Sequence, residues 1–88
     1  MQRKTFTVSN PGGLHARPAA MLVSLAKNFE SQITITQDEA TSSLKNPIGV
    51  LAMGISRGTE VTVSAKGSDE DLAIQRIAQF FEQELSAL

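Results

Sequence analysis

The residues with the clearest chemical potential lie in the stretch Asn10–Ala19 (NPGGLHARPA). It holds His15, which is the only histidine in the chain, and Arg17 two residues later. A neutral imidazole is a nucleophile that can take up a phosphoryl group. A guanidinium carries several donors that suit phosphate oxygens. These two side chains together indicate a site that accepts a phosphoryl group and gives it up again.

The elements around the histidine are predicted to place it at the start of a helix. Proline and two glycines in Asn10–Gly13 favour a turn. After this turn, a helix is predicted from Ala16 to about Lys27, because apolar residues recur at helical spacing: Ala19, Leu22, Val23 and Ala26. Pro18 is compatible with the helix, since a proline in the first turn removes an N–H that has no intrahelical partner. The free amides and the dipole of such a helix start favour an anion.

An ordinary loop histidine beside a turn is the alternative interpretation, because short motifs also occur by chance. Here the turn glycines, the arginine and the helix start coincide, which favours the functional interpretation. The positive helix end and the guanidinium also favour the neutral, nucleophilic imidazole.

A second motif lies in the segment Leu44–Gly54 (LKNPIGVLAMG). Asn46 is a favoured N-cap and Pro47 a favoured first helical residue. They predict a short helix that runs to Met53 and stops at Gly54.

The apolar residues of this short helix divide between two interpretations. Core packing accounts best for Val50 and Met53. Ile48 and Leu51 stay open between core packing and a small exposed apolar patch that docks partner proteins.

Length and composition restrict the class of protein. Its 88 residues predict a single domain, 1–88. The absence of cysteine suits a reducing cytoplasm, and a net charge of −1 argues against a broad nucleic-acid footprint. No apolar run approaches the length of a membrane span, and no signal-peptide pattern follows the first residues. We therefore expect a cytoplasmic protein without membrane insertion or a nucleic-acid partner.

The periodicity of the remaining chain predicts an α+β fold. Alternating polar and apolar residues predict strands at Lys4–Ser9, Gln32–Thr36 and Thr59–Lys66. The short polar segment Ala40–Leu44 is predicted as a weaker strand, at an edge of the sheet or in a hairpin with the preceding strand. A last helix is predicted from a capping-box-like start at Ser68–Asp71 to about Leu85. Its core-facing stripe would be Ile74, Ile77, Ala78, Phe81 and Leu85. The order β-α-β-β-α-β-α, with one solvated face on the strands, favours an antiparallel sheet with all helices on the other face.

The segment Gly13–Ala19 resembles the phosphohistidine signature of the HPr family. These proteins are the histidine-containing phosphocarriers of the bacterial phosphoenolpyruvate–sugar phosphotransferase system. The likeness covers essentially the whole chain, because the length, the position of the histidine, the second motif and the last helix fit without gaps. The resemblance implies an open-faced β-sandwich with a four-stranded antiparallel sheet and three helices on one face.

The resemblance also implies a role for individual residues. His15 would accept a phosphoryl group at Nδ1 from phosphorylated enzyme I and pass it to IIA proteins of sugar permeases. The Arg17 side chain and the backbone amides of Ala16 and Arg17 would hold that group. The protein would be a carrier rather than an enzyme, most simply a monomer, without cofactor or metal. The implied docking surface comprises Ala16, Ala20, Pro47, Ile48 and Leu51.

One residue departs from the family pattern. In many Gram-positive members the position of Asn46 holds a serine that a regulatory kinase phosphorylates. Asparagine keeps the N-cap but has no hydroxyl, so we expect no regulatory seryl phosphorylation here. The change leaves open a specialised paralogue, either of the nitrogen-related system or dedicated to one permease or kinase.

Two other classes of function stay under consideration. A regulatory docking module would use Ile48 and Leu51, with His15 as a mere contact. A stand-alone enzyme is disfavoured, because the sequence places no carboxylate near His15 and offers neither cysteine nor a metal-ligand cluster.

Overall fold

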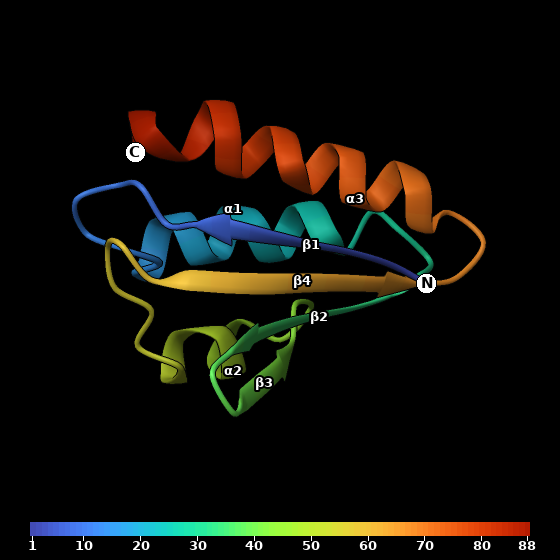
Figure 1. Ribbon diagram of the computed structural model, residues 1–88, viewed down its shortest axis with the longest axis horizontal. Helices are drawn as coiled ribbons and strands as arrows, with labels where there is room; N and C mark the ends of the chain where they lie inside the picture. Colours follow the sequence, from blue (N-terminus) through green and yellow to red (C-terminus); the bar gives the residue numbers. More distant parts are fainter.

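Four strands form one sheet in the computed structural model, which describes residues 1–88, and alternation of polar and apolar residues is clearest in the second and fourth of them (Figure 1). The strands occur in the order β1-β4-β2-β3, and each neighbouring pair is antiparallel. Their bounds are β1 Gln2–Thr7, β2 Gln32–Gln37, β3 Ala40–Ser43 and β4 Glu60–Lys66.

Three α-helices complete the predicted element order, and the predicted open-faced α+β sandwich is confirmed (Figure 1). They are α1 Ala16–Ala26, α2 Pro47–Ala52 and α3 Glu70–Gln79. The helical course continues beyond α3 with a wider π turn at Phe80–Glu84 and a 3-10 turn at Leu85–Ala87. None of the helices has both the length and the apolar character needed to cross a membrane.

The core lies between the sheet and the helices. Alternate residues of β2 and β4 are buried there, whereas β1 contributes Phe6 alone: Phe6, Ile33, Ile35, Val61, Val63 and Ala65. The rings of Phe6 and Phe81 stack with centroids 4.5 Å apart, and Phe80 meets Phe81 edge-on at 5.7 Å. Aromatic contacts of this kind add to the burial of apolar area. They attach the C-terminal helical turn to β1.

The opposite face of the sheet is covered by hydroxyl side chains. Strand pairing aligns one threonine from each strand in a row across the sheet: Thr5, Thr62, Thr36 and Thr41. Two pairs in this row, Thr5 with Thr62 and Thr36 with Thr41, share hydrogen bonds of 3.0 Å. Because this face carries polar groups, it can remain solvated, and the helices pack on the other side.

The first strand begins earlier than predicted, and its regular part ends at Thr7 rather than Ser9. Gln2 pairs with Ala65, so the polar residues at the start of the chain join the ladder without an apolar signal. Beyond Thr7 the pairing continues irregularly: Val8 N–H donates to Thr59 O at 2.9 Å, and Gly58 N–H donates to Val8 O at 2.8 Å.

The start of α3 also differs from the prediction. The residue before the helix is Asp69 rather than Ser68, and its side chain does not cap the helix. Its carboxylate instead accepts hydrogen bonds from Glu30 N–H at 2.8 Å, from Ser31 N–H at 3.0 Å and from the Ser31 hydroxyl. Glu70 supplies a different terminal contact, because its Oε1 accepts from Gly67 N–H at 3.1 Å. Asp69 therefore fastens the α1–β2 connection to α3.

The end of the last helix is predicted to within two residues, but its geometry is not. Regular α-helix stops at Gln79, and the wider turn that follows buries both neighbouring aromatic residues, Phe80 and Phe81. Arg76 spans this turn through an ion pair with Glu84 at 2.7 Å. Ile74, which the prediction placed in the core, is only half-buried.

The Asp69 contacts predict an acid-sensitive contribution to stability. Two hydrogen bonds hold the pKa of Asp69 below its usual value of 3.8. The larger effect comes from the Ser31 hydroxyl and the next from Glu30 N–H. Because the folded-state pKa is the lower one, the stabilisation is present above the unfolded-state value and is lost as the pH falls through the folded-state pKa. Asp69→Asn should therefore lower the urea midpoint of unfolding near neutral pH, and its deficit relative to wild type should shrink as the pH falls below 3.8.

The matched control is Asp71→Asn, which changes an exposed carboxylate in the same turn that accepts no side-chain hydrogen bond. This variant should leave the midpoint nearly unchanged. A deficit of Asp69→Asn that stays constant over the whole acid range would contradict the assignment.

Candidate functional site

His15 is the residue immediately before α1. Its backbone is extended (φ −81°, ψ −171°), and its carbonyl accepts the first helical hydrogen bond, from Ala19 N–H at 2.9 Å. The imidazole is exposed and makes no capping hydrogen bond to the helix. Its nitrogens are therefore not committed to the fold.

The first turn of α1 presents unused donors beside this ring. The N–H groups of Ala16 and Arg17 donate to no protein acceptor, and Pro18, which follows them, has none. The Arg17 side chain is exposed and takes part in no hydrogen bond or ion pair. A helix start with two free amides and a free guanidinium suits a bound anion such as a phosphoryl group.

The turn before His15 is held by Asn10, which the sequence analysis treated only as a turn former. Asn10 is fully buried, and its Nδ2 donates to Gly13 O at 2.6 Å while Gly13 N–H donates back to Asn10 O at 3.1 Å. Leu14, also buried, donates its N–H to Ile55 O at 3.0 Å. These bonds fix the approach of the chain to His15.

Gly13 is required at this turn for two separate reasons. Its φ is +68°, which side-chain-bearing residues rarely adopt. A Cβ at this position would also collide with the carbonyl oxygen of Ile55 and lie 2.9 Å from Cα of Ser56. The glycine therefore permits the loop to pack directly on the α2–β4 connection.

The imidazole of His15 lies against Gly12. A Cβ built on Gly12 would be 2.5 Å from Cδ2 and 2.9 Å from Nε2 of the ring, with Cγ next at 3.6 Å. The Cδ2–Nε2 edge is thus the part of the ring nearest to the loop. Nδ1 lies on the other edge, farther from Gly12.

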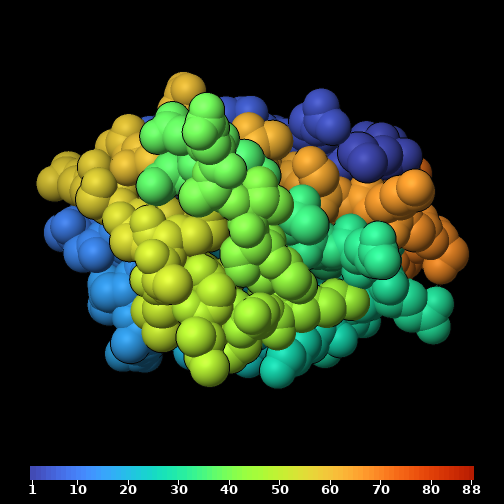
Figure 2. Space-filling view, turned by 90° about the horizontal axis from the view of Figure 1, so that it is seen from below, coloured from blue at the N-terminus to red at the C-terminus, as the bar shows by residue number.

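The structure brings the second motif beside His15. A shallow hollow next to the ring is lined by Gly12, Leu14, His15, Leu51, Gly54, Ile55 and Ser56, with no acidic side chain. Figure 2 shows this proximity: the light-blue segment that begins α1 lies against the yellow-green α2.

All five residues of the predicted docking surface are exposed, with Ile48 78% and Leu51 44% accessible. Val50 is buried, as predicted for a core residue, whereas Met53 is only half-buried and packs against the core. Met21 of α1 is a further exposed apolar residue, which the sequence analysis did not single out because its helical spacing alone does not separate the core from the surface. The exposed side of α2 is therefore apolar.

Asn46 caps α2 as predicted. Its Oδ1 accepts from Ile48 N–H at 3.1 Å and from Gly49 N–H at 3.3 Å, and Pro47 opens the helix. A Cβ on Gly49 would collide with the hydroxyl of Ser42, so the glycine lets α2 pack closely on β3. The cap and this packing hold a helix that is too short to be stable alone.

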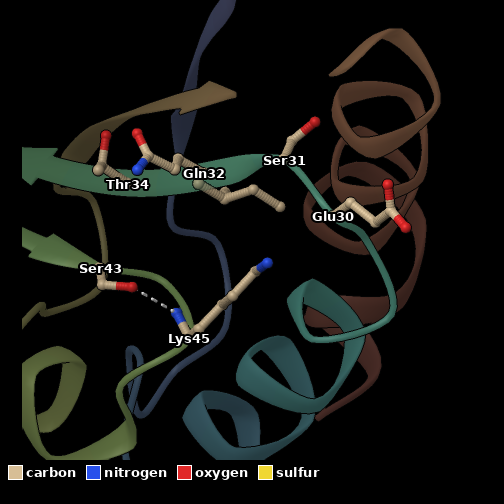
Figure 3. A pocket seen from close by; sticks show the side chains of 7 residues that line it. Glu30, Ser31, Gln32, Thr34, Ser43 and Lys45 are labelled. Atoms are coloured by element: carbon tan, nitrogen blue, oxygen red, sulfur yellow. Dashed lines mark hydrogen bonds between the residues drawn. The ribbon is translucent and has the colours of Figure 1, made fainter. Parts of the chain in front are cut away.

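A second hollow lies elsewhere, between the α1–β2 connection and the end of β3 (Figure 3). It is polar and shares no residue with the hollow beside His15. Lys45 points into it, but its Nζ donates to the carbonyl oxygen of Phe29 at 2.6 Å. Glu30 points away from Lys45 in this view. The lysine thus ties the segment after β3 to the α1–β2 connection and is not part of the His15 site.

The family model described as the PTS HPr component phosphorylation site matches residues 2–83. The chain belongs to the HPr family. The family assignment made from the His15 motif is thereby confirmed. The match includes both the His15 segment and the capped helix α2, which the structure places side by side.

Individual HPr proteins resemble the whole chain. The phosphocarrier protein HPr of Mycoplasma capricolum is 44% identical over 79 residues, which cover 90% of this chain and 89% of that protein. The crystal structure of HPr-C-His from Thermoanaerobacter tengcongensis aligns with a TM-score of 0.93 and 38% identity, covering 97% of this chain and 96% of that one. A structure described as an HPr dimer from the same organism aligns with a TM-score of 0.77 and 38% identity, covering 97% and 98%.

The turn geometry of this HPr-family chain predicts different costs for two glycine substitutions. Gly13→Ala and Gly58→Ala both place a side chain at positive φ, which costs about 1–2 kcal/mol. At Gly58, where φ is +88°, a Cβ meets open space, whereas at Gly13 it collides with the Ile55 carbonyl.

Gly13→Ala should therefore lower the free energy of unfolding in urea clearly more than Gly58→Ala does, by a further amount of about 1 kcal/mol or more. Equal losses in the two variants would show that the Ile55 contact does not constrain the turn.

Proposed function

We propose that this chain carries phosphoryl groups on His15 from phosphorylated enzyme I to IIA proteins of sugar permeases. The observation that supports the proposal most directly is the combination at the start of α1. An exposed, uncapped imidazole precedes two backbone amides without an acceptor. Because the chain belongs to the HPr family, we interpret this combination as a site that accepts a phosphoryl group.

The transfer uses the imidazole as a nucleophile. The lone pair of Nδ1 forms a bond to phosphorus as the bond from phosphorus to the donor group breaks, and the reverse step delivers the group to the acceptor. Arg17 and the amides of Ala16 and Arg17 hold the phosphoryl oxygens. Binding that was too strong would trap the phosphorylated form, because only interactions that favour the transition state accelerate transfer. One guanidinium and two amides form a modest anion site of this kind.

Partner proteins dock on the apolar surface beside His15. Ile48 and Leu51 of α2, with Pro47, Ala16 and Ala20, surround the approach to the ring and are accessible in the isolated chain. Exposed apolar side chains that cluster near a reactive group favour a protein–protein contact there. The hollow beside His15 has no acidic residue, so the partner supplies any proton-transfer group that the reaction needs.

In this proposal residues 1–88 act as one cytoplasmic phosphocarrier domain. The chain is a carrier rather than an enzyme, and it uses neither cofactor nor metal. We propose a monomer, because the docking surface must be free for successive partners.

A specialised HPr paralogue is the second candidate, and Asn46 is the observation that favours it. The residue retains the helix cap but offers no hydroxyl for a seryl kinase. A carrier without that control would serve a nitrogen-related system or a single permease or kinase. The nitrogen-related form of the second candidate differs from the first candidate in which enzyme I charges His15.

The phosphorylation site can be tested by mass spectrometry after incubation with phosphoenolpyruvate, Mg²⁺ and enzyme I. Wild type should gain a single acid-labile, base-stable phosphate, and a folded His15→Ala variant should gain none. Phosphorus–nitrogen coupling in the NMR spectrum should assign the phosphate to Nδ1. Arg17→Ala should still be phosphorylated, but about tenfold or more slowly, because one charge-assisted phosphate contact is lost.

A control carrier establishes that the enzyme I preparation is active. No phosphate on the folded wild-type chain would reject the main proposal, and charging by the enzyme I of the nitrogen-related system alone would establish the second candidate. Absence of phosphate with both enzymes would leave the regulatory docking module as the better account.

The docking surface predicts a selective effect of Ile48→Ser on partner binding. Ile48 is 78% exposed, so its replacement should leave the urea midpoint nearly unchanged. Loss of its buried area in the complex should raise the KM for enzyme I about tenfold while kcat changes little.

The matched control is Leu72→Ser, which removes a 63% exposed leucine from α3, outside the docking surface. Its KM should equal that of wild type. Equal effects of the two substitutions would argue against a specific contact on α2.

A further inference from the structure

The backbone conformation of the turn does not require a glycine at position 12. Positive φ values occur at Gly13, Gly54, Gly58 and Gly67, but not at Gly12. A residue with a side chain could therefore adopt the conformation that Gly12 has, in contrast to its neighbour Gly13.

The space next to Gly12 is what excludes a side chain. The three heavy atoms nearest to a Cβ there all belong to the ring of His15, at 2.5, 2.9 and 3.6 Å. Real Cβ atoms do not approach other heavy atoms as closely as the first two of these distances. The obstacle is thus a rotatable side chain and not the backbone, so a substitution would move the imidazole to another rotamer and leave the fold intact.

We propose that Gly12 is a positioning residue for His15. Its missing side chain forms a seat for the imidazole, with the Cδ2–Nε2 edge against the loop and Nδ1 on the side away from it. Gly12 and His15 line the same hollow as Leu51 of α2. The seat thus sets the orientation in which the ring meets a protein bound to the docking surface. The expected effect on phosphoryl transfer rests on the proposed function of His15. The position of the imidazole against Gly12 does not depend on that function.

The seat is tested first on the unphosphorylated protein by NMR. Wild type should show a nuclear Overhauser effect between Hδ2 of His15 and Hα of Gly12, and a single χ1 rotamer for His15 from its three-bond couplings. Gly12→Ala should lose the corresponding effect and change the couplings, with an unchanged urea midpoint. Gly12→Ser is a second variant with the same expected displacement. The matched control, Gly58→Ala, has open space at its Cβ and should keep the wild-type ring signals.

The consequence for reactivity is tested with enzyme I. Gly12→Ala should lower kcat for phosphorylation about tenfold or more, with KM changed less than twofold, because docking is intact and only the ring is misplaced. A merely structural role would not separate kcat from KM in this way. If the ring keeps its rotamer in both variants, the proposed seat at Gly12 does not exist. If the ring is displaced but kcat is unchanged, Gly12 has no positioning role in phosphorylation. If wild type accepts no phosphate, the proposed function fails, while the NMR comparison still decides whether the seat exists.

Discussion

The contact on which the site depends is the one between the turn before His15 and the carbonyl group of Ile55. Leu14 donates its N–H to that carbonyl at 3.0 Å, and Gly13 leaves no side chain in the way. Ile55 follows α2, so this single contact ties the start of α1 to the connection behind α2. Together with the packing of α1 on α2, it holds His15 and the exposed apolar residues of α2 on one surface.

Hydrogen bonds of Asn10 and Val8 stabilise the segment that makes this contact. Asn10 is buried beneath the turn and bonds to both backbone groups of Gly13. Before it, Val8 continues the pairing with the chain at Gly58 and Thr59. The segment leading to His15 is therefore hydrogen-bonded to the segment leading from α2 into β4. Of the buried Asn10 side-chain amide, Nδ2 is paired with Gly13 O, whereas Oδ1 has no hydrogen-bond partner, which costs free energy.

The sequence predicts the elements well, because their signals are local. Period-two alternation locates the strands, helical spacing locates α1, and Asn46 with Pro47 marks the start of α2. The failures concern contacts between distant segments. Ser68–Asp71 has the spacing of a capping box, yet Asp69 turns to the backbone of Glu30 and Ser31. The π turn after Gln79 depends on the packing of Phe80 and Phe81 against β1, which no local pattern encodes.

The same division holds within the candidate site. His15 and Arg17 are recognisable from residue type and spacing, because their chemistry is a property of the side chains themselves. The burial of Asn10 and the contact of Gly12 with the imidazole are not recognisable in this way. A glycine in a turn is ordinarily explained by a positive φ angle. The structure shows that Gly13 has a positive φ and that Gly12 does not.

In the proposed transfer the chain meets a phosphoryl donor and a phosphoryl acceptor, and the state of its site suits both. The ring of His15, the Arg17 guanidinium and the amides of Ala16 and Arg17 make no bonds to the rest of the chain. No internal hydrogen bond has to be broken before a phosphoryl group or a partner binds, so little reorganisation energy opposes either step. The groups that are constrained lie beneath the site, in the turn. Reactivity is thus left to free side chains, while their position is set by a backbone that cannot move without losing Asn10 and Ile55 as partners.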